Sequence, residues 1–593
     1  MSKITNTFLP TSLKEMKALG WDQADVILFS GDAYVDHPSF GTAVIARVLE
    51  ADGYKVAVIP QPNWRDDLRD FKKLGAPRLF FGVSSGNMDS MVNHYTANLR
   101  LRSNDAYTPE GKAGFRPDYA VTVYSKILKR LYPDIPIIIG GIEASLRRLT
   151  HYDYWSNTLK PSILVDSEAD LLIYGMGEKT ILEVAHQLAN GHKLEQLRSI
   201  RQLAFIDSNI EKYRKNERNV VLNSFEECCS DKKKFGANFK IIETESNKVN
   251  AVTIVEPFAD KCIVVNPPLP LPTTEETDNW YKLPFTRLPH PRYKGKNIPA
   301  WEMIKFSVNI HRGCFGGCSF CTISAHQGKF IVSRSEESIL DEIERIKQMP
   351  DFKGYLSDIG GPSANMYMMK GKNEDICKKC HRYSCIYPSI CSNLDANHQH
   401  INHLYSKIRT VSGIKKAFVS SGVRYDLFID RGGKDEVEYF ENLCRYHVSG
   451  RLKVAPEHTS DKVLQRMRKP SFKLFKKLVN QFEAINEKFA LKQQIIPYFI
   501  SSHPGSTEKD MQELANETKK LNFKLEQVQD FTPTPMTLSS VIYYTEEDPY
   551  TGEKVYVAKT KKDKQKQLSY FFWYKDKNKT SGIPETKNKK RMH

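Results

Sequence analysis

The sequence predicts an α/β protein in which a doubly wound parallel sheet is followed by a partial (β/α)6 barrel of the TIM type. In the first third of the chain, short apolar runs end in Gly or Ser and alternate with segments of helical spacing. After residue 300, six further strand-and-helix units repeat this order. Strands that alternate with helices form parallel sheets, and ligands bind at the carboxyl ends of such strands.

Four parts are predicted along the chain. We expect a sheet domain over residues 1–188, a connector over 189–300, a barrel over 301–545 and a basic tail over 546–593. A length of 593 residues suits several domains, and 40% hydrophobic residues suffice for ordinary cores.

The composition favours a cytoplasmic protein that makes no contact with a membrane. The start of the chain does not resemble a signal peptide, and no apolar run approaches the ~20 residues that a membrane span needs. Seven of the eleven cysteines fall in two tight groups. This grouping favours metal binding over disulfides, and a reducing compartment suits it.

Five apolar runs in the sheet domain are predicted as strands. Each ends in small or polar residues, and Thr42–Asp52, between the first two, has the spacing of a helix. The runs with their polar ends are 26–32, 54–60, 79–86, 136–141 and 171–178.

Residues 189–300 are predicted to connect the two units. Asn266–Pro272 contains four prolines and is expected to be extended. Lys232–Lys234 is expected to be a solvated loop.

Six strand ends are predicted in the barrel, where the active site of such a fold lies. They fall in residues 305–310, 355–362, 417–424, 452–458, 495–505 and 525–531.

Three cysteines follow the first barrel strand in the pattern CxxxCxxC, at Cys314, Cys318 and Cys321. Thiolates are the usual ligands of iron–sulfur clusters. Three thiolates hold three irons of a [4Fe–4S] cube and leave the fourth open for chemistry. Half of a zinc site is the alternative, but zinc sites usually take their cysteines in CxxC pairs.

A second group, Cys377, Cys380, Cys385 and Cys391, lies within fifteen residues. Four thiols at this spacing suit a tetrahedral zinc site or an auxiliary iron–sulfur cluster. The third alternative is a set of thiols without metal.

The tail carries much of the positive charge. Residues 553–593 hold thirteen Lys and Arg against four acids, so nine of the seventeen net positive charges lie there. Phe571–Tyr574, an aromatic patch, interrupts the basic residues. Basic residues around aromatic ones suit RNA, through phosphate contacts and base stacking. The favoured alternative is that the patch docks on the barrel.

The cysteine pattern in its strand-end setting resembles the radical S-adenosylmethionine (radical SAM) superfamily. The resemblance implies that Cys314, Cys318 and Cys321 hold a [4Fe–4S] cluster whose open iron chelates S-adenosylmethionine (SAM), with Phe320 near the adenine. One electron would then cleave SAM to methionine and a 5′-deoxyadenosyl radical, so an electron donor of the flavodoxin or ferredoxin type is implied.

The same resemblance implies further SAM contacts. Backbone carbonyls of Gly360 and Gly361 are expected to bind the SAM amino group, although proline follows them where the superfamily has glutamate. Ser421, Arg424 and Glu457 are the polar partners expected for the ribose and the SAM carboxylate.

The sheet domain resembles the cobalamin-binding domain that precedes many radical SAM barrels. That domain ligates cobalt with Asp-x-His-x-x-Gly, whereas this chain has Asp36 and His37 adjacent and Gly41 one residue too far. We therefore expect no bound cobalamin. Alternatively, Asp32, Asp36 and His37 line a substrate pocket.

Longer sequence motifs identify the chain as similar to the YgiQ family of radical SAM proteins. The resemblance covers nearly the whole chain and leaves the substrate open. The motifs lie at residues 360–367, 421–426, 454–459, 497–507 and 529–536.

Three functions remain open at this stage. The leading one is a radical SAM enzyme in which Tyr498, His458 and His503, near strand ends, move protons. The second is a radical methyl- or methylthio-transferase acting on RNA or protein. The third is a non-catalytic iron–sulfur redox sensor.

Overall fold

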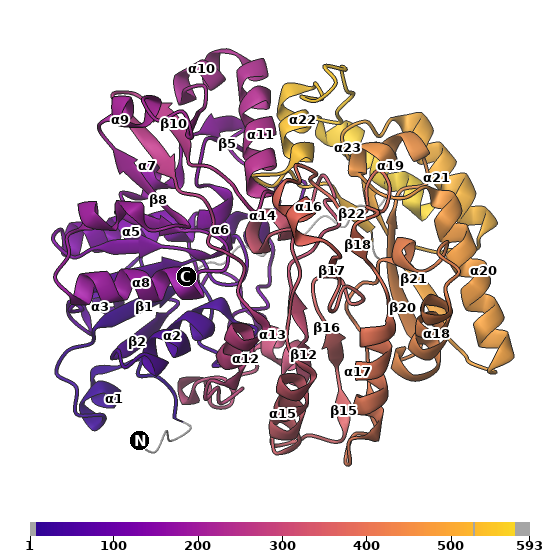
Figure 1. Ribbon diagram of the computed structural model, residues 1–593, viewed down its shortest axis with the longest axis horizontal. Helices are drawn as coiled ribbons and strands as arrows, with labels where there is room; N and C mark the ends of the chain where they lie inside the picture. Colours follow the sequence, from indigo (N-terminus) through magenta and orange to yellow (C-terminus); the bar gives the residue numbers. More distant parts are fainter. Residues whose placement is uncertain (1–6, 526–527, 576–593) are drawn as a thin grey trace, which may run out of the picture.

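The computed structural model describes residues 7–525 and 528–575. Figure 1 shows two units side by side: the sheet domain in indigo to magenta, and the barrel in pink to yellow. This agrees with the predicted fold class.

The sheet domain contains a nine-stranded sheet, with the order β2-β1-β3-β4-β7-β8-β11-β10-β9 in the described part of the chain. The five predicted runs form β1, β2, β3, β4 and β7, which pair in parallel. The strands are β1 Val26–Ser30, β2 Val56–Pro60, β3 Phe80–Ser84, β4 Ile137–Ile139, β7 Leu171–Ile173, β8 Leu203–Asp207, β9 Val220–Val221, β10 Ile254–Phe258 and β11 Lys261–Val265.

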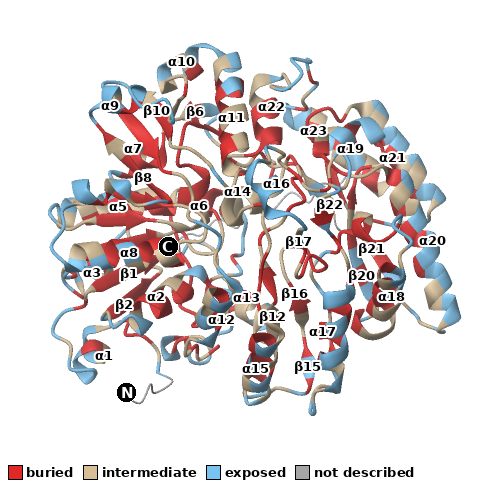
Figure 2. Cartoon of the chain, in the orientation of Figure 1, coloured by how far each residue is buried: buried red, intermediate tan, exposed pale blue. Residues whose placement is uncertain are grey.

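Alternate residues of each central strand enter two separate cores. On β1, Val26 and Leu28 join one apolar cluster with the helix α2 (Gly41–Ala51). Ile27 and Phe29 join the other cluster with α5 (Ala120–Leu131). A strand that is apolar on both faces is therefore covered by helices on both sides, as a doubly wound sheet requires. Figure 2 shows the buried strands between partly exposed helices.

Part of the expected connector belongs to the sheet. The strands β8 to β11 add to the edge beside β7, and β8 pairs with both neighbours in antiparallel fashion. Antiparallel additions need no crossover helix, so they lack the strand-and-helix alternation that marked the first five strands. The predicted boundary at residue 188 therefore does not end the sheet domain. Lys232–Lys234, expected as a loop, begins α11 (Lys232–Ser246).

Of the remaining helices of the first unit, α8 packs on the sheet beside α2, through Ile181, Val184 and Ala185. These remaining helices are α1 Leu13–Ala18, α3 Arg69–Lys72, α4 Ser90–His94, α6 Gly141–Leu146, α7 Ile163–Ser167, α8 Glu178–Ala189, α9 Ile210–Arg214, α10 Phe225–Ser230, α12 Thr274–Lys282 and α13 Pro299–Ile304, with a small hairpin of β5 His151–Asp153 and β6 Thr158–Lys160.

Each of the six strands predicted for the barrel is present, and those that pair with one another do so in parallel. The strand β12 pairs with β16, and β15, which lies just before β16 in the chain, pairs with β19. The last three strands form the sheet β20-β21-β22. The strands are β12 Ser307–Asn309, β15 Tyr355–Leu356, β16 Asp358–Gly360, β19 Lys416–Ala417, β20 Arg451–Glu457, β21 Gln494–Ser501 and β22 Val528–Asp530, with β13 His311–Arg312, β14 Val332–Ser333, β17 Lys370–Gly371 and β18 Leu394–Asp395 in excursions. Residues 526 and 527 of the last prediction lie outside the described residues.

Helices follow the strands and cover the outside of the barrel (Figure 1). Apolar residues of strands and helices form one core, for example Val308 on β12 with Ile343 on α15 and Phe499 on β21 with Phe475 on α20. The helices are α14 Ile323–Gln327, α15 Glu336–Lys347, α16 Glu374–Lys378, α17 Gln399–Thr410, α18 Lys434–Asn442, α19 Asp461–Met467, α20 Phe472–Lys488, α21 Glu508–Lys520, α22 Leu538–Thr545 and α23 Lys561–Ser569.

The aromatic patch of the tail docks on the barrel, which confirms the favoured alternative. Phe571 is fully buried, and its ring lies 6.4 Å from that of Phe499. The Gln567 side chain bonds to the backbone of the loop after β21, at Ser502 N (2.8 Å) and Ser506 O (2.7 Å). Trp573 Nε1 donates to Thr518 Oγ1. Residues 576–593 lie outside the described residues, so RNA binding by the tail stays a prediction.

Within the described residues, no helix combines the length and the apolar character that crossing a bilayer requires.

The docking predicts that Phe571→Ala destabilises the barrel by about 3–5 kcal/mol, because the change removes a fully buried ring and leaves a cavity. Urea titration followed by tryptophan fluorescence measures the effect. Phe115→Ala is the matched control, because Phe115 is 42% exposed; it should change the free energy of unfolding by less than about 0.5 kcal/mol. Equal effects of the two changes would contradict the docking.

Candidate functional site

The loop that carries Cys314, Cys318 and Cys321 lies at the carboxyl end of the first barrel strand, directly before α14. Its glycines allow close packing. Gly317 has φ +62°, and a Cβ there would lie 2.6 Å from the Tyr383 carbonyl oxygen and 2.7 Å from Ser384 Cβ. The loop is thus held against the segment of the second cysteine group.

The three thiols are half-buried and have polar neighbours. Cys314 Sγ lies 3.6 Å from Ser363 Oγ, and Arg424 Nη1 lies 3.4 Å from Cys318 Sγ. Burial raises the pKa of the Cys314 thiol and raises that of Cys321 to about 12. A metal deprotonates a coordinating thiol outright. Three thiols on one loop beside a buried cation therefore fit a cluster with an open iron.

Arg424 lies against this loop. Its Nε and Nη2 bond to both carboxylate oxygens of Asp426, at 3.0 and 2.6 Å. Burial opposes the charged carboxylate, but Arg424 outweighs burial and lowers the pKa of Asp426. The remaining nitrogen, Nη1, faces Cys318. The backbone N–H of Arg424 donates to Asn365 Oδ1. The structure brings Arg424 to the thiols, while its contact with a SAM carboxylate stays a prediction.

Gly360 and Gly361 lie at the end of β16, next to the cysteine loop. The Gly360 carbonyl accepts a hydrogen bond from Ile310 N at 2.8 Å. A Cβ on Gly361 would lie 2.5 Å from Cε1 of the buried His311. Ser421 lies on the neighbouring strand end, and its hydroxyl donates a hydrogen bond to the Asp358 carboxylate. Its contact with SAM stays a prediction.

Glu457 ends β20 with φ +69° and is 8% exposed. Lys469 Nζ lies 3.7 Å from Glu457 Oε1. Burial raises the pKa of Glu457, and Lys469 and Arg424 oppose the rise.

His503 and Phe320 meet beside the cluster loop, with rings 6.0 Å apart at 81°. His503 Nε2 lies 2.7 Å from Ser539 Oγ, which bonds to Ser319 Oγ at 2.8 Å. Burial lowers the pKa of His503 to about 3. His503 is therefore neutral and fixes the loop through two serines.

His458 and Tyr498 occupy different surroundings. His458 is fully buried; its Nδ1 accepts from Ser460 N at 3.0 Å, and its Nε2 lies 3.3 Å from Ser506 Oγ. Tyr498 is half-buried on β21, on the face opposite Phe499 and the outer helices. Of the three predicted proton carriers, the geometry leaves Tyr498 on the inner face of the barrel.

The second cysteine group lies beside the first. Cys377 lies in the last turn of α16, and Cys385 N donates to the Phe315 carbonyl at 3.1 Å. Burial raises the pKa of the Cys385 thiol to about 11; Lys329 opposes the rise, and the thiols of Cys380, Cys391 and Cys377 add to it. The four thiols thus share one neighbourhood.

Among the described residues, no group of three or more His, Cys, Asp and Glu side chains is arranged to hold a single metal ion.

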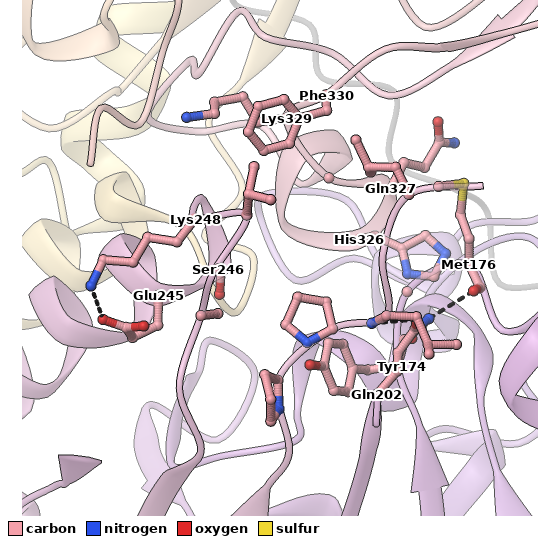
Figure 3. Close-up of a pocket in the computed structure, with 18 of the residues that line it drawn as sticks. Tyr174, Met176, Gln202, Glu245, Ser246, Lys248, His326, Gln327, Lys329 and Phe330 are labelled. Carbon is pink, nitrogen blue, oxygen red and sulfur yellow. Dashed lines mark hydrogen bonds and ion pairs between the residues drawn. The ribbon is translucent and has the colours of Figure 1, made fainter. Parts of the chain in front are cut away.

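Two cavities lie between the sheet domain and the segment that follows the cysteine loop. One, of about 130 Å³, is lined by Tyr174 and Gln202 on the sheet side and by His326 and Lys329 on the barrel side (Figure 3). The other, of about 440 Å³, lies at the carboxyl ends of the central sheet strands and is also lined by His326. The residues at its floor include Ser84, Gly140, Gly141 and Gly175, from β3 and the loops after β4 and β7.

Asp36 and His37 do not line these cavities. Asp36 is fully buried in an ion pair with Arg47 at 2.5 Å. His37 Nδ1 accepts from Ser39 N at 3.0 Å, and the ring is fully buried. Burial, the larger cause, and Arg287 keep the pKa of His37 well below its usual value. Asp36 and His37 therefore support the loop after β1, whereas the residues that follow them, Pro38, Ser39 and Gly41, line the larger cavity.

Sequence reasoning missed His326, Lys329 and Arg312. Arg312 forms a buried ion pair with Glu178 of the sheet domain. All three lie within fifteen residues of the cysteine triad, and this proximity was the available signal.

Family models match three parts of the chain. "Radical SAM N-terminal" matches residues 8–307, "Radical SAM superfamily" matches 308–518, and a domain of unknown function (DUF3362) matches 526–583. The junction at residue 307 agrees with a first unit that includes the expected connector.

Curated relatives match over most of their length. A UPF0313 protein of Porphyromonas gingivalis is 60% identical over 96% of this chain and 90% of its own. UPF0313 protein YgiQ of Escherichia coli is 44% identical over 95% of this chain and 83% of its own. Among solved structures, the radical S-adenosylmethionine methyltransferase TsrM from Kitasatospora setae, with cobalamin and a [4Fe–4S] cluster bound, has 13% identity and a TM-score of 0.46, covering 87% of this chain and 77% of that one.

The geometry of His458 predicts a pH effect on stability. Burial lowers its pKa from 6.5 to about 4. The folded chain thus binds fewer protons than the unfolded chain, and the stability present above pH 6.5 declines as the pH falls towards 4. Between pH 7 and pH 5 this group alone should cost about 2 kcal/mol. In His458→Asn the difference in unfolding free energy between the two pH values should shrink by that amount. An unchanged difference would show that folding leaves the pKa of His458 at its unfolded value.

Proposed function

The chain belongs to the UPF0313 family and carries radical SAM domains, and we propose that it cleaves SAM reductively to give a 5′-deoxyadenosyl radical. The observation that carries the proposal is the loop of Cys314, Cys318 and Cys321 at the first strand end of a parallel barrel. Active sites of such barrels lie at this end. The match to the radical SAM superfamily supports an enzymatic function and does not identify a substrate.

The chain's own residues would hold the cofactors. The three thiolates would ligate three irons of a [4Fe–4S] cluster and leave the fourth for SAM. When bound, the cluster supplies the single electron that cleaves the sulfonium into methionine and the 5′-deoxyadenosyl radical. A reductant of the flavodoxin or ferredoxin type would supply that electron.

Arg424 has a charge-balancing role in this proposal. Its Nη1 lies 3.4 Å from Cys318 Sγ, while Asp426 fixes its other nitrogens. Thiolates in a buried site are stabilised by a cation whose geometry is fixed, because little reorganisation is needed. We therefore assign Arg424 to the cluster side of the site.

Gly361 is the better candidate of the two glycines for the SAM amino group. The Gly360 carbonyl is already paired with Ile310 N. No described residue donates to the Gly361 carbonyl. Proline at 362 leaves this carbonyl unaffected, so an ammonium donor can reach it without a glutamate.

The cavity of about 440 Å³ is our candidate for the substrate pocket. It lies at the carboxyl ends of the sheet strands, where open α/β sheets bind ligands, and two residues of α14, His326 and Gln327, line it. Tyr498, on the inner barrel face, is the residue we retain as a candidate for proton movement.

Cys318→Ala should reduce 5′-deoxyadenosine formation to background under anaerobic, reducing conditions, because the cluster loses one of its three ligands. Product is measured by liquid chromatography after incubation with SAM and dithionite. Cys229→Ala is the matched control, because Cys229 is exposed and lies outside both groups; it should leave the yield unchanged. Undiminished formation by Cys318→Ala would refute the proposed reaction.

Gly361→Ala should weaken SAM binding about tenfold, the effect of one lost hydrogen bond to a charged group. The added methyl would collide with the His311 ring and move the carbonyl. Equilibrium dialysis with labelled SAM measures the dissociation constant. Gly422→Ala, where a Cβ meets nothing within 4 Å, is the control. Unchanged affinity in Gly361→Ala, at equal iron content, would remove Gly361 from the SAM site.

A further inference from the structure

The second cysteine group forms an excursion on the barrel rim between β17 and β18, which pair as a short antiparallel hairpin. Cys377, Cys380, Cys385 and Cys391 are all partly buried and free of disulfides. The hairpin closes the excursion at its base, so the four thiols are held on one compact segment.

Hydrogen-bond donors contact the sulfurs of Cys377 and Cys380. Asn393 Nδ2 lies 3.3 Å from Cys377 Sγ, and Arg382 N lies 3.4 Å from Cys380 Sγ. Donors of this kind stabilise the thiolate form and tune iron–sulfur centres.

The buried charge of Lys329 is the decisive feature. Lys329 is 1% exposed, and its Nζ lies 3.8 Å from Cys380 Sγ and 2.7 Å from the Arg382 carbonyl. No carboxylate of the described residues forms an ion pair with it. A buried ammonium is costly unless an anion compensates it. Metal-bound thiolates at Cys380 and its three neighbours would supply that negative charge, whereas four neutral thiols would not.

The arrangement favours a cluster over a single ion. A tetrahedral zinc ion draws its sulfurs to about 3.8 Å from one another, and neither cysteine group is arranged to hold one ion. In a four-iron cube each thiolate binds its own iron, so the sulfurs lie farther apart. The second group therefore resembles the first in this respect, and it has a fourth thiol in addition.

We propose that Cys377, Cys380, Cys385 and Cys391 hold a second iron–sulfur cluster that passes single electrons to the first. The two sites are adjacent: Ser384 Oγ lies 2.9 Å from the Gly316 carbonyl, and Cys314, Cys385 and Cys391 border one apolar cluster around Phe315. The reduced second cluster loses one electron to the first and is reduced again by an external one-electron donor. This relay role rests on the proposed function; the presence of the cluster does not.

Iron content after anaerobic reconstitution tests the cluster. The wild-type chain should bind about eight irons, and Cys314→Ala/Cys318→Ala/Cys321→Ala should keep about four with the absorption of an iron–sulfur cluster. That variant cannot cleave SAM, so its iron reports on the second site alone. Cys380→Ala/Cys391→Ala should likewise lose half of the iron. No iron in the triple variant, or about one zinc in its place, would overturn the proposal.

A charge variant supplies a second readout. In the triple-variant background, Lys329→Met should lower the reduction potential of the second cluster, because a nearby cation stabilises the reduced, more negative state. Redox titration followed by electron paramagnetic resonance measures it. Lys378→Met is the control, since Lys378 is exposed and paired with Asp375. Equal potentials for wild-type Lys329 and Lys329→Met would remove Lys329 from the site.

Discussion

The contact of Ser384 with the cysteine loop is the constraint on which the candidate site depends. Its fully buried hydroxyl lies 3.1 and 2.9 Å from the carbonyls of Phe315 and Gly316 and accepts hydrogen bonds from Ile386 N and Tyr387 N. Such closeness is possible because Gly317 has no side chain. One hydroxyl therefore ties both cysteine groups together, and neither loop can shift without disturbing the other.

Much of the architecture could be predicted because local patterns specify it. The runs at 26–30 and 56–60 are apolar on both faces, and each ends where a parallel strand must turn. The strand β8 was missed because it joins the sheet through antiparallel pairs, without the strand-and-helix alternation that marked the first five strands. The cysteine triad was found from spacing alone, but the contact between Arg424 and Cys318 spans 106 positions and follows only from the folded barrel.

Buried ion pairs join the two units and explain why so many charges are tolerated inside. Glu342 on α15 pairs with Arg287 from the segment before the barrel and with Arg334. Arg312 pairs with Glu178 on α8. Each pair is stable only while both partners are present, because an uncompensated buried charge is costly. Lys329 is buried to the same degree, and its Nζ lies 3.8 Å from Cys380 Sγ in place of a carboxylate. In the proposed second cluster, the compensating anion would come from the cysteines.

The facing edges of the two units define what the larger cavity can accept. Its charged lining residues are Glu178 and Arg312, which neutralise one another. Burial lowers the pKa of His326 to about 4, so at neutral pH this ring is an uncharged hydrogen-bonding group. The other lining residues are glycines, aliphatic and aromatic side chains, and neutral polar groups such as Ser84 and Asn87. A cavity of this kind favours a neutral, partly apolar ligand, because an ion would lose its hydration without gaining a counter-charge. Such a ligand would contact α14 immediately after the cysteine triad, which links the sheet edge to the site of radical formation proposed for this chain.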